Sequence, residues 1–437
     1  MNKRISTLAA AALAALNGIA AAQAPADLVL LPAPADAWRI SAGTWESRVD
    51  LTGASAVTPP NLPGEPNARV GVSASGAAGR REALAFDWRD AWFASLRLES
   101  AVPLDLRPWL GGTLEFDLHV DALEQGGLGV KVACGNGCER RVPLLEPARA
   151  ISGKGWQRLA VSMSCFQREG GDFSRVTLPF ALEAGGSGRV SVSNVRLVAT
   201  GKGSVACADY RTESVTPVPL VESWSLDWWM PRHEAKRKLA RELVAAGHSP
   251  KLVFIGDSIT EGWEKEGQSV WQRAYAPHDA LDLGFGGDRT ENVLWRLQHG
   301  ELDGLAPKVT VLMIGTNNTG HRAEDPQTTA AGIRRIVQEI RQRLPGTQVL
   351  LLAIFPRGEK PDDELRRLNE RVNGLIAPLA DGRVVHYLNI NAAFTRPDGT
   401  LSRDVQPDLL HLSEQGYAIW QREMQPTLAK LLGAATP

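Results

Sequence analysis

Short apolar runs alternate with helical patterns throughout the second half of the chain, and this alternation restricts the fold more than any other feature. Helical patterns, with apolar residues on one face, cover residues 333–344 and 417–431. The runs between the helical patterns are typical of parallel strands buried on both faces, and they occupy residues 252–255, 280–283, 309–314, 349–354 and 384–388. The alternation predicts a three-layer α/β/α domain with a five-stranded parallel sheet.

The first half of the chain has a different pattern and predicts antiparallel strands. Residues 113–120 and 189–197 alternate apolar with polar side chains, as half-buried strands do. Glycine-rich turns separate such runs, and no convincing 3.6-residue periodicity is present. We therefore predict two domains, with an antiparallel β-sandwich over 30–210, a connector and helix over 211–245, and the α/β/α domain over 246–437.

The predicted connector is rich in tryptophan. Trp224, Trp228 and Trp229 could form a surface binding patch, but we favour a role in the contact between the two domains. A charged helix is predicted over residues 233–246, because Pro231 precedes it and Gly247 follows it, as is common at helix ends.

The first 22 residues predict a signal peptide. Lys3 and Arg4 precede an apolar run over residues 8–16, and small residues follow up to Ala22. A buried N-terminal helix is the alternative interpretation. No later segment approaches the ~18 consecutive apolar residues of a membrane-spanning helix. We expect an exported protein, periplasmic or secreted, without a membrane span.

The balance of charged residues excludes two classes of partner from the expected ones. Lys and Arg total 48 against 49 Asp and Glu, so nucleic acid and anionic membranes are not the expected partners.

The four cysteines all lie in the first half of the chain and allow three disulfide pairings. Cys134 and Cys138 would close a tight loop, which predicts the pairs Cys134–Cys138 and Cys165–Cys207. A zinc site is the alternative, but it needs paired short spacings that Cys165 and Cys207 lack.

Polar motifs follow the first three predicted strands of the α/β/α domain. Ser258, in Gly256-Asp257-Ser258, stands where a nucleophilic hydroxyl would be exposed at the sheet edge. Gly287 could present a backbone N–H there, and Asn317 could add a side-chain amide. Because the carboxyl ends of parallel strands meet at one edge, these groups would face one cavity. A helix N-cap and an Asx turn are the alternatives for Ser258 and Asn317.

Asp408 and His411 supply the remaining chemistry near the C-terminus. A carboxylate three residues before an imidazole can accept from Nδ1 and leave Nε2 free to take a proton from Ser258. A surface ion pair is the alternative. Arg289 replaces the glycine that a dinucleotide fingerprint requires, and the zinc spacing H-E-x-x-H is absent from the sequence. We therefore expect no organic cofactor and no metal.

Together these blocks resemble the SGNH (GDSL) hydrolase family, in particular its platelet-activating-factor acetylhydrolase type, over residues 228–432. The resemblance extends through Gly286-Gly287-Asp288, Gly315-Thr316-Asn317-Asn318, and residues 293–297, 300–302 and 356–361. It implies a flavodoxin-like fold and a serine esterase with Ser258, His411 and Asp408 as its triad. It also implies an oxyanion hole formed by Ser258, Gly287 and Asn317. Finally, it implies a shallow acyl pocket at Ile259, Thr316 and Leu410 that favours acetyl groups.

The first half carries a second resemblance. The residues that carry it are Cys134-Gly135 with Cys138, Gly155-Trp156, Cys165-Phe166, Pro179-Phe180 and Cys207. Over residues 36–210 their order is similar to the galactose-binding-like β-sandwich appended to some bacterial family 3 β-glucosidases, the ExoP type. This resemblance implies a carbohydrate context. We interpret Trp156, Phe166 and Phe180 as core residues rather than sugar-stacking platforms.

The expected function is the removal of O-acetyl groups from polysaccharide or oligosaccharide. A broad-range short-chain lipid or aryl esterase is the first alternative. A carbohydrate-binding protein with an inactive hydrolase domain is the second. The sequence leaves open whether the protein is a monomer or a homodimer.

Overall fold

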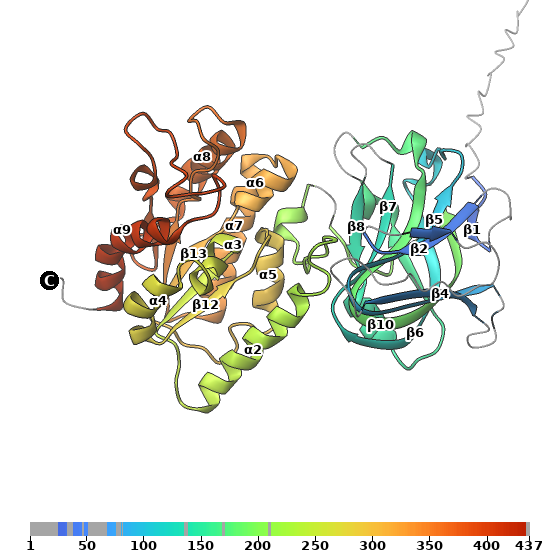
Figure 1. The fold of residues 1–437 in the computed structure, drawn as a ribbon, viewed down its shortest axis with the longest axis horizontal. Coiled ribbons are helices and arrows are strands. Elements are labelled where there is room, and N and C mark those ends of the chain that lie inside the picture. Colours follow the sequence, from blue (N-terminus) through green and yellow to red (C-terminus); the bar gives the residue numbers. More distant parts are fainter. Residues whose placement is uncertain are drawn as a thin grey trace, which may run out of the picture.

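The chain folds into two domains that lie side by side (Figure 1). The computed structural model describes residues 25–32, 38–45, 48–50, 68–75, 80, 82–134, 139–167, 171–208 and 211–433. We call residues 25–208 the β-domain, 211–228 the connector and 229–433 the α/β domain. The predicted signal peptide over 1–22 lies outside the described residues. Among the described helices, none is long and apolar enough to cross a membrane.

The β-domain is an antiparallel sandwich, as predicted. Its strands are β1 (Leu28–Leu31), β2 (Trp38–Gly43), β3 (Arg48–Asp50), β4 (Arg69–Ser75), β5 (Ala83–Ser100), β6 (Thr113–Gln125), β7 (Leu128–Ala133), β8 (Arg140–Pro143), β9 (Gln157–Ser162) and β10 (Leu178–Val198). The long strands β5 and β10 pair with each other over most of their length. The first part of β10 also pairs with β7 and its second part with β6. The register of β10 shifts on either side of Gly186, where these two parts meet.

Aromatic side chains fill the interior of the β-domain. Phe166 and Phe180 are completely buried, which confirms their interpretation as core residues. Trp156 is half-buried and lies beneath the Arg80 guanidinium, 4.6 Å from the ring centroid. A short helix, α1 (Leu145–Ile151), was not expected from the sequence. With seven residues it completes only two turns, too few to produce a clear helical period.

A disulfide joins Cys165 to Cys207, as predicted. It links the segment after β9 to the segment after β10, across 42 residues of sequence. The other predicted pair cannot be placed, because Cys138 lies outside the described residues.

Replacing Cys165 and Cys207 together by serine should destabilise the β-domain by about 2–4 kcal/mol, because the closed loop no longer restricts the unfolded chain. Hydrogen exchange followed by mass spectrometry should show faster exchange in peptides from β9 and β10. Peptides from the parallel sheet of the α/β domain, which contains no cysteine, should keep their protection. Equal loss of protection in both domains would contradict this prediction. Ser164→Ala, at an exposed neighbouring position, is the control.

The α/β domain contains the predicted five-stranded parallel sheet. Its strands are β11 (Leu252–Gly256), β12 (Ala280–Gly284), β13 (Val309–Met313), β14 (Gln348–Leu352) and β15 (Val385–Leu388). Their order across the sheet is β12-β11-β13-β14-β15, and every adjacent pair is parallel. Each strand overlaps its predicted run because continuous apolar sequence is needed where both faces are covered. The first three strands along the chain are adjacent, so their carboxyl ends converge.

Helices cover both faces of this sheet (Figure 1). They are α2 (Trp229–Ala245), α3 (Ser258–Glu261), α4 (Gln268–Ala274), α5 (Thr290–Gln298), α6 (Thr316–Arg322), α7 (Pro326–Arg343), α8 (Glu364–Ile376) and α9 (Glu414–Leu432). Side chains of α2, α5, α7 and α8 share one core cluster with the sheet, and those of α4 and α9 share the other. Helix α2 begins at Trp229, four residues before the predicted run, and Pro231 lies within its first turn, as its use as a start signal implied. Proline is tolerated there because that turn has no backbone acceptor for its missing N–H.

The tryptophan-rich segment lies at the contact between the domains, as we favoured. Trp229 packs in an apolar cluster that includes Leu145 from α1 of the β-domain. Trp224 and Trp228 are half-buried against the same cluster. On the β-domain side, Gly185 approaches the connector so closely that a Cβ would lie 2.6 Å from the backbone nitrogen of Asp227.

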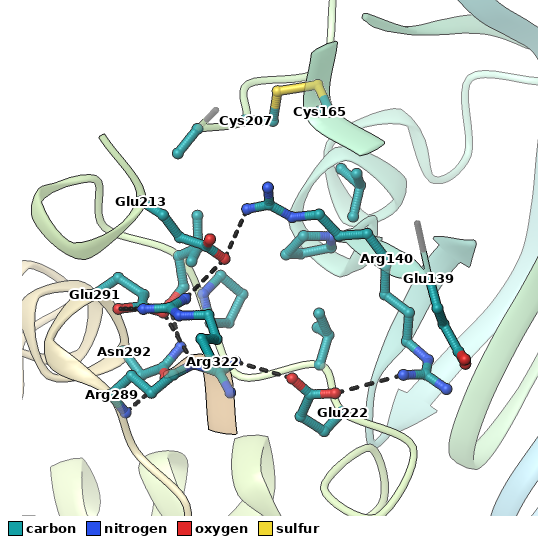
Figure 2. A pocket seen from close by; sticks show the side chains of 17 residues that line it. Glu139, Arg140, Cys165, Cys207, Glu213, Glu222, Arg289, Glu291, Asn292 and Arg322 are labelled. Carbon is teal, nitrogen blue, oxygen red and sulfur yellow. Dashed lines mark hydrogen bonds and ion pairs between the residues drawn. A yellow bond between two sulfur atoms is a disulfide. The ribbon is translucent and has the colours of Figure 1, made fainter. Parts of the chain in front are cut away.

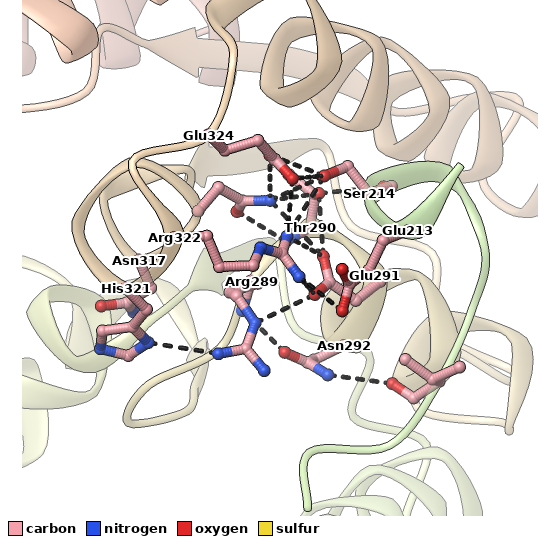
Figure 3. Close-up of polar contacts among 12 residues, drawn as sticks. Glu213, Ser214, Arg289, Thr290, Glu291, Asn292, Asn317, His321, Arg322 and Glu324 are labelled. Carbon is pink, nitrogen blue, oxygen red and sulfur yellow. Dashed lines mark hydrogen bonds and ion pairs between the residues drawn. The ribbon is translucent and has the colours of Figure 1, made fainter. Parts of the chain in front are cut away.

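The start of the connector is anchored inside the α/β domain (Figure 3). Ser214 is completely buried, and its hydroxyl donates to the carboxylate of Glu324 at 2.7 Å. The same hydroxyl accepts from Nδ2 of Asn318 at 3.1 Å, while the hydroxyl of Thr290 donates to the Ser214 carbonyl at 2.9 Å. These buried bonds hold the connector against the first turns of α5 and α6.

Candidate active site

Ser258 is held at the tip of β11 by a tight turn. It is the first residue of α3, and the buried carboxylate of Asp257 caps this helix by accepting from the backbone N–H of Ile259 at 3.0 Å. Burial raises the pKa of Asp257 to about 7. From α9, the hydroxyl of Tyr417 donates to the carbonyl of Ile259 at 2.7 Å. The turn is therefore fixed from two directions. Ser258 adjoins a helix cap rather than acting as the N-cap residue.

Ser258, His411 and Asp408 form a continuous chain of contacts. Oγ of Ser258 lies 2.9 Å from Nε2 of His411, and Nδ1 of the same ring lies 2.6 Å from Oδ2 of Asp408. The other carboxylate oxygen, Oδ1, accepts from the backbone N–H groups of Leu410 at 3.0 Å and His411 at 2.7 Å. The loop thus fixes the carboxylate, and the carboxylate orients the ring. A hydroxyl, a base and an orienting carboxylate in this order can perform nucleophilic catalysis.

The charge of Asp408 is maintained by these hydrogen bonds. Partial burial alone would raise its pKa, but the bonds from the side chain and backbone of His411 outweigh this effect and lower it. Asp408 is therefore ionised at neutral pH and can stabilise a positive charge on the ring. Beside this chain lies an open pocket of about 390 Å³, lined by Ser258, His411, Tyr417 and neighbouring residues.

Gly287 lies in the turn after β12, beside the β11 tip. Its φ of +72° is in the left-handed region, which strongly favours glycine. A Cβ at this position would also lie 2.0 Å from the ring of Trp224. Conformation and space therefore both require glycine here.

Asn317 lies in the first turn of α6, after β13, and is almost completely buried. Its Nδ2 donates to the carbonyl of Asp288 at 3.0 Å. This bond ties the amide to the turn that contains Gly287. It uses one of the two amide hydrogens and leaves the other for a ligand.

A buried polar network supports that turn. The carboxylate of Asp288 accepts from Nε1 of Trp229 at 2.6 Å and from Nε of Arg296 at 2.8 Å. Arg296 also pairs with Glu301, and all three charged side chains are completely buried. Burial raises the pKa of Asp288 to about 7, although Arg296 acts in the opposite direction. From the sequence, Asp288, Arg296 and Glu301 stood out only as parts of motifs, with no role of their own.

The three residues of the expected acyl pocket occupy different environments. Ile259 and Thr316 are each only 1% exposed, and Leu410 is half-buried. The backbone carbonyl of Thr316 accepts from Nη1 of Arg357 at 3.0 Å. None of the three expected residues lines the open pocket beside Ser258. Ile259 and Thr316 instead belong to the packed interior next to Ser258 and Asn317.

Two further residues near the site were given no place at the active site from the sequence. Arg357 follows β14 and anchors the start of α6, and its only signal was the motif Pro356-Arg357-Gly358. Trp224 contacts Gly287, and its signal was the tryptophan-rich connector. Among the described residues, no group of three or more His, Cys, Asp or Glu side chains is arranged to hold a metal ion.

The chain is similar to known proteins in both of its domains. Residues 254–419 match the GDSL-like Lipase/Acylhydrolase family, and residues 45–197 match a galactose-binding domain-like family, Exop_C. The platelet-activating factor acetylhydrolase IB subunit alpha1 of Pongo abelii is 42% identical over 184 residues, which cover 42% of this chain and 77% of that relative. This chain belongs to the GDSL-like lipase/acylhydrolase family.

Solved structures resemble each part of this GDSL-family chain. An exo-1,3/1,4-beta-glucanase (EXOP) from a Pseudoalteromonas species is 18% identical with a TM-score of 0.34, covering 42% of this chain and 22% of that one. An acetyl-xylooligosaccharide esterase from Geobacillus is 18% identical with a TM-score of 0.36, covering 43% of this chain and 97% of that one.

Proposed function

We propose that this GDSL-family protein is an exported serine esterase that removes O-acetyl groups from carbohydrate. The hydrolytic part rests on one observation, the unbroken contact chain from Ser258 through His411 to Asp408 at the carboxyl end of the parallel sheet. Such an arrangement needs only a bound ester and water to complete acyl transfer.

The proposed reaction has two steps. Oγ of Ser258 attacks the ester carbonyl while Nε2 of His411 takes its proton, and Asp408 stabilises the resulting imidazolium. The tetrahedral oxyanion accepts hydrogen bonds from the backbone N–H groups of Ser258 and Gly287 and from the amide of Asn317. The intermediate then collapses: the ester C–O bond breaks, His411 gives the proton to the leaving sugar oxygen, and the sugar departs as a free hydroxyl while the acyl group stays on Ser258. Water, deprotonated by the same ring, attacks the acyl-enzyme and releases acetate and free Ser258.

Two features support a carbohydrate ester as the substrate. The β-domain matches a galactose-binding domain-like family. The Cys165–Cys207 disulfide is typical of proteins in an oxidising compartment, where extracellular polysaccharide is found. The predicted signal peptide agrees with such a location.

The acyl-chain preference tests this proposal against a broad-range lipid or aryl esterase. We expect kcat/KM to fall from 4-nitrophenyl acetate through butyrate to octanoate. In our proposal the acyl group faces the packed side chains of Ile259 and Thr316 rather than the open pocket, and these buried side chains leave no room for a longer chain. In an open apolar site each methylene could instead gain about 0.8 kcal/mol by burial. Hydrolysis of octanoate as fast as acetate would favour the lipid or aryl esterase.

Acetate release from acetylated xylan is the companion measurement. We expect the protein to release acetate from the polymer in addition to hydrolysing 4-nitrophenyl acetate. A folded protein that hydrolyses none of these esters would instead support a carbohydrate-binding protein with an inactive hydrolase domain.

A further inference from the structure

A second cavity lies beside the candidate active site, at the contact between the two domains. It has a volume of about 280 Å³, close to the lower end of ligand pockets. The connector contributes Glu222 and Trp224, and the α/β domain contributes Arg289 and His321. Arg141 of the β-domain completes this part of the wall. The cavity adjoins a narrower one of about 70 Å³ that shares Glu222, Arg289 and Arg141 (Figure 2).

Trp224 links this cavity to the proposed oxyanion hole. The atoms of its six-membered ring are those that a Cβ on Gly287 would strike. Its ring stacks on that of Trp228, with centroids 6.3 Å apart and planes 24° apart, and it meets the ring of His321 edge-on. The indole is held on these sides yet remains half-buried and lines the cavity. Trp224 is therefore a rigid aromatic surface in direct contact with the turn that contains Gly287, which is proposed to bind the oxyanion.

The polar groups of the cavity are fixed in place. Oε1 of Glu222 accepts from Arg289 at 3.0 Å, and Oε2 accepts from Arg141 of the other domain at 3.4 Å. Arg289 also lies 3.2 Å from Nδ1 of His321 (Figure 3). Burial alone would raise the pKa of Glu222, but the two arginines lower it to about 2. Burial and Arg289 lower the pKa of His321 to about 4, so its ring is neutral at pH 7.

This mixture of groups suits a neutral polyhydroxyl ligand. The lining places the carboxylates of Glu139 and Glu222 beside the guanidinium groups of Arg141, Arg289 and Arg322, so a charged ligand of either sign would meet groups of its own charge. Sugar hydroxyls both donate and accept hydrogen bonds, so they can use the carboxylate and the guanidinium groups together. The C–H face of a pyranose ring is apolar and can cover the exposed part of an indole.

We propose that this cavity is a subsite for one pyranose unit of the carbohydrate chain, next to the unit that carries the ester. The inference rests on the proposed function and deepens it. The sugar ring stacks on Trp224, and its hydroxyls bind Glu222 and Arg289. The β-domain then contributes to substrate binding through Arg141, which holds Glu222 in position from across the domain contact.

Direct binding tests the subsite without turnover. In full-length protein carrying Ser258→Ala, isothermal titration calorimetry would measure the Kd of partially acetylated xylo-oligosaccharides and gluco-oligosaccharides. Adding Trp224→Ala should weaken binding at least about tenfold, as truncation of an aromatic side chain that a ligand covers does. Adding Trp224→Phe should restore most of the affinity. Trp45→Ala is the matched control, because this tryptophan is exposed on the β-domain and should not affect binding.

Two binding results would overturn the proposal. One is unchanged affinity in the Trp224→Ala protein, which would place the sugar elsewhere. The other is the absence of binding of any of these oligosaccharides to the Ser258→Ala protein.

Kinetics on the active protein separate a subsite from a structural role of Trp224. Trp224→Ala should lower kcat/KM for the acetylated oligosaccharide at least about tenfold more than kcat/KM for 4-nitrophenyl acetate. Equal losses on both substrates would mean that Trp224 only supports Gly287, and would overturn the subsite. If the protein binds oligosaccharide through Trp224 but releases no acetate, the subsite stands and the esterase proposal fails.

Discussion

Replacing Ser258 by alanine should lower kcat for 4-nitrophenyl acetate about a millionfold, as loss of the nucleophile does in subtilisin. The residual rate would come from the oxyanion donors and from substrate binding, which the substitution leaves in place. Stability should change little, because the Ser258 side chain contacts the open pocket and, among the described residues, its hydroxyl bonds only to His411. The turn itself is held by Asp257 and Tyr417, which remain.

The measurement is a progress curve with both proteins at equal concentration, together with thermal unfolding of each. Ser164→Ala, the same substitution at an exposed position of the β-domain, should match the unsubstituted protein in both assays. Turnover by Ser258→Ala within tenfold of the unsubstituted protein would exclude Ser258 as the nucleophile.

Replacing Asn317 by alanine should lower kcat about 10²–10³-fold and leave KM nearly unchanged. The amide hydrogen that is not bound to Asp288 would stabilise only the developing oxyanion, so its loss raises the barrier without weakening substrate binding. Asn317→Asp should be at least as damaging, because a carboxylate has the same shape but no hydrogen to donate.

A structural effect of the same substitution has to be separated from the catalytic one. Asn317→Ala also removes the bond to the Asp288 carbonyl, so thermal unfolding must accompany the kinetics. Asn389→Ala, at an exposed position after β15, is the matched control. An increase in KM with unchanged kcat would show that Asn317 binds the substrate rather than the transition state.

The features that sequence predicted best are those set by short stretches of chain. The five parallel strands could be predicted because a strand covered on both faces must be apolar along its whole length. Asp408 and His411 could be predicted as a pair because their spacing alone allows the carboxylate to reach Nδ1. The placement of Ser258 opposite His411 needed the family resemblance, since the two residues are 153 positions apart and only the fold brings them together.

Features that depend on contacts between distant segments could not be predicted. Helix α1 is too short to produce a period. The environment of Trp224 arises from the packing of the connector against the turn that contains Gly287, and nothing near Trp224 in sequence specifies this contact. The pairing of Glu222 with both Arg289 and Arg141 likewise requires three segments to meet. Trp224, Glu222, Arg289 and Arg141 all line the proposed sugar subsite.

The anchored connector has a consequence for how such domains can be recombined. Ser214 is hydrogen-bonded within the α/β domain, so the connector has to stay with that domain when the β-domain is replaced by another. The junction between the new domain and the rest of the chain must therefore lie before Arg211. A join at residue 246 would separate the hydrolase from Trp224 and from helix α2. The incoming domain would also need a glycine opposite Asp227, since any side chain there would push the connector outward. The exchange of β-domains is therefore limited less by the connector itself than by the shape of the β-domain surface against which the connector packs.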